Sequence, residues 1–138
     1  MITRVGFFRE LSHGEPDGPS LHDALEHAED QADRAVIVKY LRSGRVIAAA
    51  AGPTHDVLSP DKTPHLPLKI CTDGRFVWPA DYAYYVDRYR IPVPDALRDV
   101  AVDRLGVVPS LSDEDVGRVI GEYLDTPPPQ SDDERADA

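Results

Sequence analysis

The side chains that most often carry catalysis are few in this chain. It contains one cysteine, Cys71, and five histidines among 138 residues. Cys71, His55 and Asp56 could supply a nucleophile, a base and an orienting carboxylate if a strand carrying Cys71 met the loop carrying the other two. No local signature of a cysteine hydrolase accompanies them. A small hydrolase-like enzyme using the His55–Asp56 loop is therefore an alternative and not the leading hypothesis.

The sequence does not indicate a metal or cofactor site. His22 and Glu26 lie four residues apart on one face of an expected helix, with His27 beside them, but no third ligand is evident. The glycine-rich patterns that hold phosphates, GxGxxG and GxxxxGK followed by Ser or Thr, do not occur. We predict no catalytic residue, no metal site and no cofactor.

Aromatic side chains gather between Ile70 and Pro94, a segment that holds six of the ten aromatic residues of the chain. Aromatic rings bring large apolar areas, so we expect this segment to nucleate the core. At about 100° per residue, a helix over residues 80–90 presents one core-facing arc. Its members are Tyr82, Tyr85, Val86 and Tyr89.

Tyr84 lies outside that arc, with Asp81 about one turn before it and Arg88 about one turn after it. Trp, Tyr and Arg are enriched at binding hot spots. We therefore predict a partner-binding surface formed by Asp81, Tyr84 and Arg88, together with Trp78 at the end of the preceding strand. For Trp78 we favour a place in the core over a place on this surface, whereas for Tyr84 both interpretations stay open.

Hydrophobic periodicity and turn residues predict an α+β fold. We expect an antiparallel sheet built from hairpins, packed with about four helices. Ser43-Gly44 and Asp73-Gly74 are typical of tight hairpin turns, and Ser20 and Ser112 are typical N-caps. The expected strands lie near residues 2–10, 35–41, 45–51, 68–72 and 75–78, and the helices near 21–31, 80–90, 95–105 and 113–124.

Residues 1–126 are expected to form a single α+β domain. Within it, the proline-rich segment from Gly52 to Pro67 reads as a long loop of unassigned role, with a short extended piece near His55 to Leu58. Residues 127–138 follow three consecutive prolines and are acidic and poor in apolar residues. Such a composition cannot bury enough apolar surface to order itself, so we predict a disordered acidic tail.

The formal charge of −10 is unevenly distributed. Residues 1–33 carry −6, residues 34–110 carry +3 and residues 111–138 carry −7. An acidic surface repels phosphate backbones, which argues against nucleic-acid binding and favours a basic protein partner. No apolar run approaches the roughly 20 residues of a membrane span, and the N-terminal segment lacks the features of a signal peptide. We predict a cytoplasmic protein with no membrane association, and the oligomeric state is left open.

Two stretches resemble segments of a family of small bacterial proteins of actinobacterial type. The first is TDGRFVWPADYAYYVDRYRIPVPDAL, in which a Thr-Asp-Gly turn precedes a Trp-Pro pair, a Tyr-Tyr-Val helix and a proline-containing break. The second is FFRELSHGEPDGPSL near the N-terminus. Some proteins with the first motif resemble immunity proteins of bacterial toxin systems. That resemblance implies a protein that occupies a toxin, and it implies no catalytic residue.

The leading hypothesis is therefore a non-enzymatic, small, acidic binding protein, immunity-like in role, that acts by occluding a protein partner. Two alternatives remain. One is the small hydrolase-like enzyme of the His55–Asp56 loop, and the other is a structural protein that self-associates through its hairpin edges.

Overall fold

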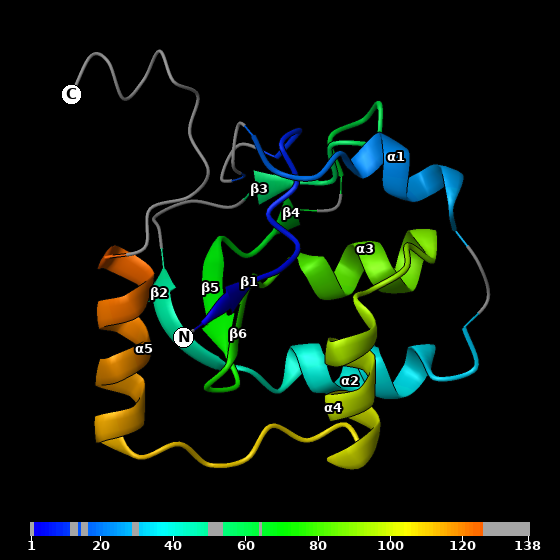
Figure 1. The fold of residues 1–138 in the computed structure, drawn as a ribbon. Coiled ribbons are helices and arrows are strands. Elements are labelled where there is room, and N and C mark those ends of the chain that lie inside the picture. The colour runs from blue at the N-terminus through cyan, green and yellow to red at the C-terminus, as the bar shows by residue number, and fades with distance from the viewer. Residues whose placement is uncertain are drawn as a thin grey trace, which may run out of the picture.

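A four-stranded sheet organises the chain (Figure 1). The computed structural model describes residues 2–11, 14, 17–28, 31–49, 54–63 and 65–125. The strand order is β1-β6-β5-β2, in which β1 runs parallel to β6 and the other neighbours are antiparallel. The strands span Thr3–Arg4 (β1), Arg45–Ala49 (β2), Lys69–Thr72 (β5) and Phe76–Pro79 (β6). The tail predicted at 127–138 lies outside the described residues.

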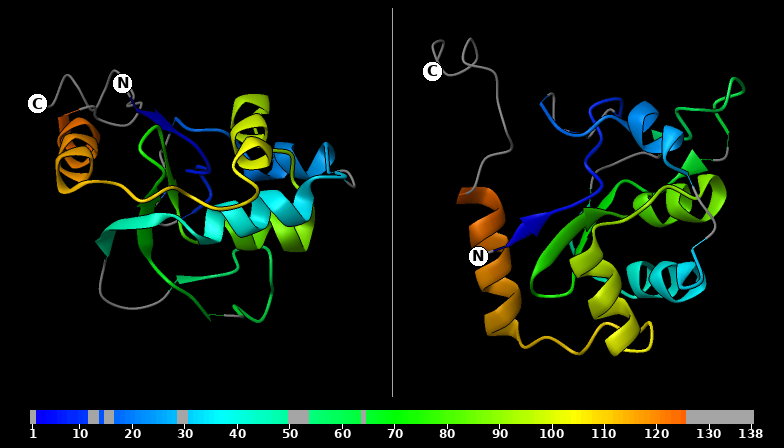
Figure 2. Two further views of the ribbon diagram at one scale, coloured as in Figure 1. Left: turned by 90° about the horizontal axis from the view of Figure 1, so that it is seen from below. Right: turned by 45° about the vertical axis from the view of Figure 1, so that its right-hand side comes forward.

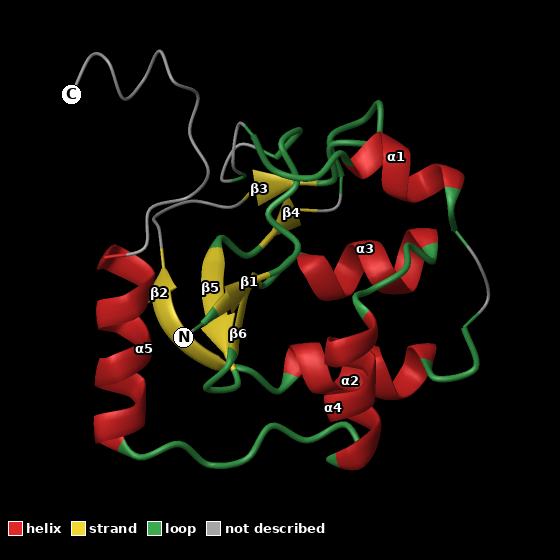
Figure 3. Ribbon diagram, in the orientation of Figure 1, coloured by secondary structure: helices red, strands yellow, loops and turns green. Residues whose placement is uncertain are grey.

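Helices cover both faces of this sheet (Figures 2 and 3). Helix α5 lies on one face and packs Val119 and Tyr123 against Val77, whereas the other face contacts α2, α3 and α4. Side chains of β6 alternate between the two layers, as a strand requires. The helices span Leu21–Glu26 (α1), Arg34–Arg42 (α2), Tyr82–Tyr89 (α3), Asp95–Asp103 (α4) and Asp113–Asp125 (α5). The predicted α+β class is confirmed, with a mostly antiparallel sheet.

The hairpin predicted around Asp73-Gly74 is confirmed. Strands β5 and β6 pair antiparallel, with Cys71 opposite Trp78. Asp73 Oδ1 accepts hydrogen bonds from the backbone N–H groups of Arg75 (2.9 Å) and Phe76 (2.7 Å). Gly74 has φ +100°, a conformation that favours glycine. The turn thus satisfies its own backbone donors and fixes the register of the two central strands.

The hairpin predicted over residues 35–51 is wrong, because its first arm is the helix α2. Ile37, Val38, Tyr40 and Leu41 are buried, whereas Ala35, Lys39 and Arg42 are exposed, which is the burial pattern of a helix with one apolar face. Ser43 ends the helix by donating its hydroxyl to the Tyr40 carbonyl (2.8 Å). The second arm, β2, pairs instead with β5 and lies at the sheet edge.

The N-terminal strand is shorter than the predicted 2–10. Gly6 interrupts it at φ +77°, and a Cβ there would lie 2.5 Å from Cγ of Tyr82. Beyond this bend Phe7 joins the α5 side of the core and Phe8 joins the other side. Gly6 therefore marks a close approach of the backbone to the Tyr82 ring.

The remaining elements differ from prediction mainly at their ends. Helix α1 stops at Glu26 rather than near 31, while α3, α4 and α5 begin and end within about two residues of the predicted bounds. The long loop contains an unpredicted two-stranded pair, β3 (Thr54–His55) and β4 (His65–Leu66). Within the described part of the chain, no helix is long and apolar enough to cross a membrane.

Candidate binding site at the C-terminal end of helix α3

A surface hollow of about 850 Å³ lies beside the C-terminal end of α3. Its lining includes three arginines and one carboxylate, in a chain whose formal charge is −10. The charged and aromatic side chains that line it are Arg34, Arg88, Arg90, Asp87, Tyr84 and Tyr89. Guanidinium groups offer planar, forked donors for carboxylates, and tyrosine rings offer rigid contact area. The hollow therefore combines the two residue types that dominate binding hot spots.

The end of α3 determines how these groups are presented. Arg90 adopts a left-handed conformation (φ 57°), and its N–H caps the helix by donating to the Val86 carbonyl. The Arg88 guanidinium lies 5.5 Å from the centroid of the Tyr89 ring, within the range of a cation–π contact. Arg34 comes from the start of α2, which packs against α3. Two helices thus supply the positive charge of the hollow.

Buried Asp56 holds the tyrosines of the hollow in place. Its Oδ2 accepts hydrogen bonds from the hydroxyls of Tyr84 (2.7 Å) and Tyr89 (2.5 Å), and its Oδ1 accepts from the N–H of Leu58 (2.8 Å). The Tyr85 hydroxyl accepts from the Val57 N–H (3.0 Å). The loop after β3 is in this way fastened to α3 by side-chain hydrogen bonds.

These contacts keep the tyrosine hydroxyls protonated. Burial, followed by the hydrogen bond to Asp56, raises the pKa of Tyr84 and of Tyr89, and the nearby Arg88 partly opposes this shift. Burial is also the main cause of the raised pKa of Tyr85. The hydroxyls of Tyr84 and Tyr89 therefore stay neutral, and able to donate to Asp56, even where an ordinary tyrosine begins to ionise.

Neither a protein-family model, nor a curated protein, nor a solved structure matches this chain. The resemblance to immunity proteins stays a prediction.

The four residues predicted as a partner-binding surface are divided between core and surface. Trp78 is fully buried and donates its indole N–H to the Leu41 carbonyl (3.1 Å), and Asp81 is only 1% exposed. Tyr84 is partly buried and Arg88 is exposed, and both line the arginine-rich hollow. A second hollow, of about 360 Å³, is lined by Tyr84 and Asp81 together with Cys71. Tyr84 therefore lies between two hollows, and Arg88 accompanies it in one of them.

The proposed enzyme trio is not assembled in this hollow. Cys71 lines it, but its lining does not include His55 or Asp56. Asp56 is engaged by two tyrosine hydroxyls, and burial raises the pKa of the Cys71 thiol, which disfavours the nucleophilic thiolate. Within the described residues, no group of three or more His, Cys, Asp or Glu side chains could hold a metal ion.

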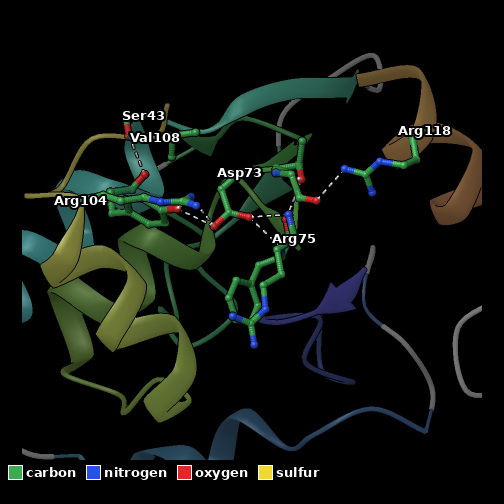
Figure 4. A network of polar contacts seen from close by, with 10 residues as sticks. Ser43, Asp73, Arg75, Arg104, Val108 and Arg118 are labelled. Atoms are coloured by element: carbon green, nitrogen blue, oxygen red, sulfur yellow. Dashed lines mark hydrogen bonds and ion pairs between the residues drawn. The ribbon is translucent and has the colours of Figure 1, made fainter. Parts of the chain in front are cut away.

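A second buried carboxylate, Asp73, serves the fold in a similar way (Figure 4). Its Oδ2 accepts the Tyr40 hydroxyl (2.5 Å) and lies 3.7 Å from Arg104, whose guanidinium also donates to Tyr40 (2.7 Å). Burial and this carboxylate raise the pKa of Tyr40. Close by, the Val108 N–H donates to the Ser43 hydroxyl (2.9 Å), which ties the segment after α4 to the end of α2.

Sequence reasoning missed Arg34, Tyr89 and Arg90 as members of the hollow. The residues after Arg34 have strand propensity, so the sequence does not mark Arg34 as the first residue of a helix. Tyr89 was assigned to the core by helical phase, although it is partly exposed. The left-handed turn at Arg90 has no sequence signal, because that position is commonly a glycine or an asparagine.

Proposed function

We propose that this protein is a non-enzymatic binding protein that occludes a protein partner, with its contact surface centred on the hollow formed by Arg34, Tyr84, Arg88, Tyr89 and Arg90. The observation that carries the proposal is the gathering of three arginines and two tyrosines in one hollow of an otherwise acidic chain. Asp56 holds two of these aromatic groups in advance of binding, which lowers the entropy lost on association.

The charges suggest what the partner presents. The exposed Arg88 guanidinium in the hollow favours a carboxylate at the centre of the contact. The acidic surface elsewhere favours basic residues around that carboxylate and speeds the encounter. The resemblance to immunity proteins supports a toxin as the partner, and occlusion of its working surface as the mode of action.

Affinity purification from extracts of the source cells tests this proposal. The tagged wild-type chain is expected to retain one stoichiometric protein, and Tyr84→Ala and Arg88→Ala are each expected to weaken binding by about 10- to 100-fold, because hot-spot truncations typically cost ~1.5–3 kcal/mol. Arg98→Ala is the matched control, since Arg98 lies on α4 and pairs with Asp95 and Asp99 at the surface. Absence of a stoichiometric partner, or equal loss in all three variants, would contradict the proposal.

Self-association is a second candidate function, favoured by the exposed edge strand β2. Val46 on this strand is 44% exposed, and among the residues that the structure describes the strand pairs only with β5. Open edges can recruit another strand. Light scattering at high protein concentration distinguishes self-association from partner binding. A strict monomer would exclude self-association and leave the partner-binding proposal intact.

A further inference from the structure

Two histidines face each other across the small sheet that closes the long loop. Strands β3 and β4 pair antiparallel, and His55 lies directly opposite His65 in that ladder. Side chains of directly opposite residues leave an antiparallel ladder on the same face, with their Cβ atoms about 4.5–5.5 Å apart. The two imidazoles are therefore neighbours, although ten positions separate the residues in the sequence.

The burial of the ladder indicates which face carries the two imidazoles. The adjacent pair of the ladder, Thr54 and Leu66, is buried, with each residue 7% exposed. His55 is only partly buried, and His65 is exposed. Since side chains alternate between the two faces of a strand, Thr54 and Leu66 face the protein and the two histidines face outward. The imidazole pair is thus accessible from the solvent.

Contacts outside the ladder fix its register. The Tyr85 hydroxyl donates to the His55 carbonyl (3.4 Å), which fastens β3 to α3. The next residue, Asp56, accepts hydrogen bonds from two tyrosine hydroxyls of the same helix. On β4, a slip by one residue would expose buried Leu66 and bury His65. The two imidazoles are therefore held opposite each other before any ligand binds.

Paired imidazoles are suited to a transition metal. A neutral imidazole always has one ring nitrogen with a free lone pair, and Zn²⁺ binds such nitrogens at about 2.0–2.1 Å. Two nitrogens on one tetrahedral ion are then about 3.3 Å apart, which side chains on opposite residues of a ladder can reach. Among the described residues, neither ring is engaged in a hydrogen bond or ion pair, whereas His27 Nδ1 bonds the Asp23 carbonyl (3.0 Å).

We propose that His55 and His65 together bind one divalent transition-metal ion of the kind that prefers imidazole, such as Zn²⁺. Because no group of three or more His, Cys, Asp or Glu side chains in the described part of the chain could hold a metal, water completes the coordination and the ion is exchangeable. The ion joins the two ends of the loop that carries Asp56, and it stabilises the fold because it binds the folded chain. Neither histidine lines the arginine-rich hollow, so the proposal is independent of the protein-binding proposal.

Calorimetric titration of the untagged chain with Zn²⁺ at neutral pH tests this proposal. The wild type is expected to bind one ion per chain. His55→Asn and His65→Asn should each weaken binding by at least about tenfold, because the second imidazole of a pair binds intramolecularly. His22→Asn is the matched control, since His22 is an exposed histidine on α1 whose neighbour one turn away is Glu26. It should leave the affinity for Zn²⁺ unchanged.

Mg²⁺ is the control for the acidic surface of a chain whose formal charge is −10. Mg²⁺ prefers oxygen ligands, so it should not bind at the concentrations at which Zn²⁺ saturates the site. Equal binding of Mg²⁺ would assign the ion to carboxylates and overturn the proposal.

Thermal unfolding supplies a second measurement that also checks the fold of each variant. Zn²⁺ should raise the melting temperature of the wild type and of His22→Asn, but not that of His55→Asn or His65→Asn. Absence of saturable Zn²⁺ binding to the wild type would overturn the proposal. Unchanged affinity in either His55→Asn or His65→Asn would also overturn it, because the ion would then not need both imidazoles.

Discussion

Asp56 shows how a buried carboxylate in a loop can serve the geometry of a site without taking part in chemistry. It is 1% exposed and accepts hydrogen bonds from two tyrosine hydroxyls and one backbone N–H. A buried charge is tolerated only when such partners satisfy it. Asp56 could have been the orienting carboxylate of an enzyme. Its contacts are better explained by a structural role, which is to hold the rings of Tyr84 and Tyr89 beside Arg88.

Replacement of Asp56 by alanine should therefore destabilise the fold strongly. The change leaves the hydroxyls of Tyr84 and Tyr89 and the Leu58 N–H without their acceptor, and we expect a loss of about 2–4 kcal/mol in the free energy of unfolding. Urea unfolding measures it. Asp61→Ala, at an exposed position in the same loop, is the control and should change stability by less than about 0.5 kcal/mol. A similar small effect of Asp56→Ala would show that its hydrogen bonds are dispensable.

At the level of single residues, the sequence predicted burial better than it predicted the site. Helical phase placed Tyr82, Tyr85 and Val86 in the core, where they lie. It could not indicate that Tyr84 would bond Asp56, because that partner is 28 residues away in a loop with no periodic pattern. Asp81 belongs to the surface that the same phase argument predicts, yet it is 1% exposed.

Among the elements, α2 is the one whose type the sequence predicts wrongly, as a strand instead of a helix. Val36, Ile37 and Val38 are β-branched and favour strands by intrinsic propensity, and Ser43-Gly44 suits a hairpin. Packing of one face against α3 and α4 overrides that preference, as tertiary context often does. By contrast, the hairpin β5–β6 carries Asp-Gly in a turn whose backbone donors bond locally to Asp73, and its prediction is confirmed.

Helix α1 depends on a cap supplied from outside the helix. With six residues it is too short to be stable alone. Glu10 accepts hydrogen bonds from the Ser20 hydroxyl (2.8 Å) and from the N–H groups of Leu21 (2.8 Å) and His22 (3.2 Å). Burial alone would raise the pKa of Glu10, but the hydrogen bonds from Leu21, Ser20 and His22 outweigh it and lower the pKa to about 2. The ionised carboxylate is thus an integral part of the helix start.

This contact should make stability depend on pH in the acid range. Because the pKa of Glu10 is lower in the folded chain than its ordinary value of 4.5, its contribution is fully present above about pH 4.5 and is lost as the pH falls toward 2. At pH 6, Glu10→Gln should lower the free energy of unfolding by about 1–2 kcal/mol, a value reduced for the partial exposure of the group.

Urea unfolding from pH 6 down to pH 2 measures this difference. The gap between the wild type and Glu10→Gln should narrow as the pH falls. Glu26→Gln, an exposed position at the other end of the same helix, is the control for loss of a charge alone. A gap that stays constant over this range would mean that the neutral side chain caps α1 equally well.

For the whole molecule, the class of fold was predictable but its topology was not. The hairpin β5–β6 and three helices with clear apolar faces, α3, α4 and α5, suffice to indicate an α+β chain. The order of the sheet depends on β1 joining β6 in parallel, a pairing between Thr3 and Phe76 that no local pattern encodes. Likewise, each hollow is lined by segments that are distant in sequence, so its shape follows from the topology and not from a motif.

The polar network around Asp73 should couple parts of the molecule that are distant in sequence. It joins Tyr40 of α2, the β5–β6 turn and Arg104 at the end of α4 (Figure 4). Because Arg104 donates to the Tyr40 hydroxyl, a double-mutant cycle of Tyr40→Phe and Arg104→Ala should give a coupling energy of about 0.5–1.5 kcal/mol in urea unfolding. A cycle of Tyr40→Phe with Arg98→Ala, which alters the same helix outside the network, should be additive within about 0.5 kcal/mol. Additivity in both cycles would mean that the hydrogen bond from Arg104 to Tyr40 contributes nothing measurable to the contact between α2 and α4.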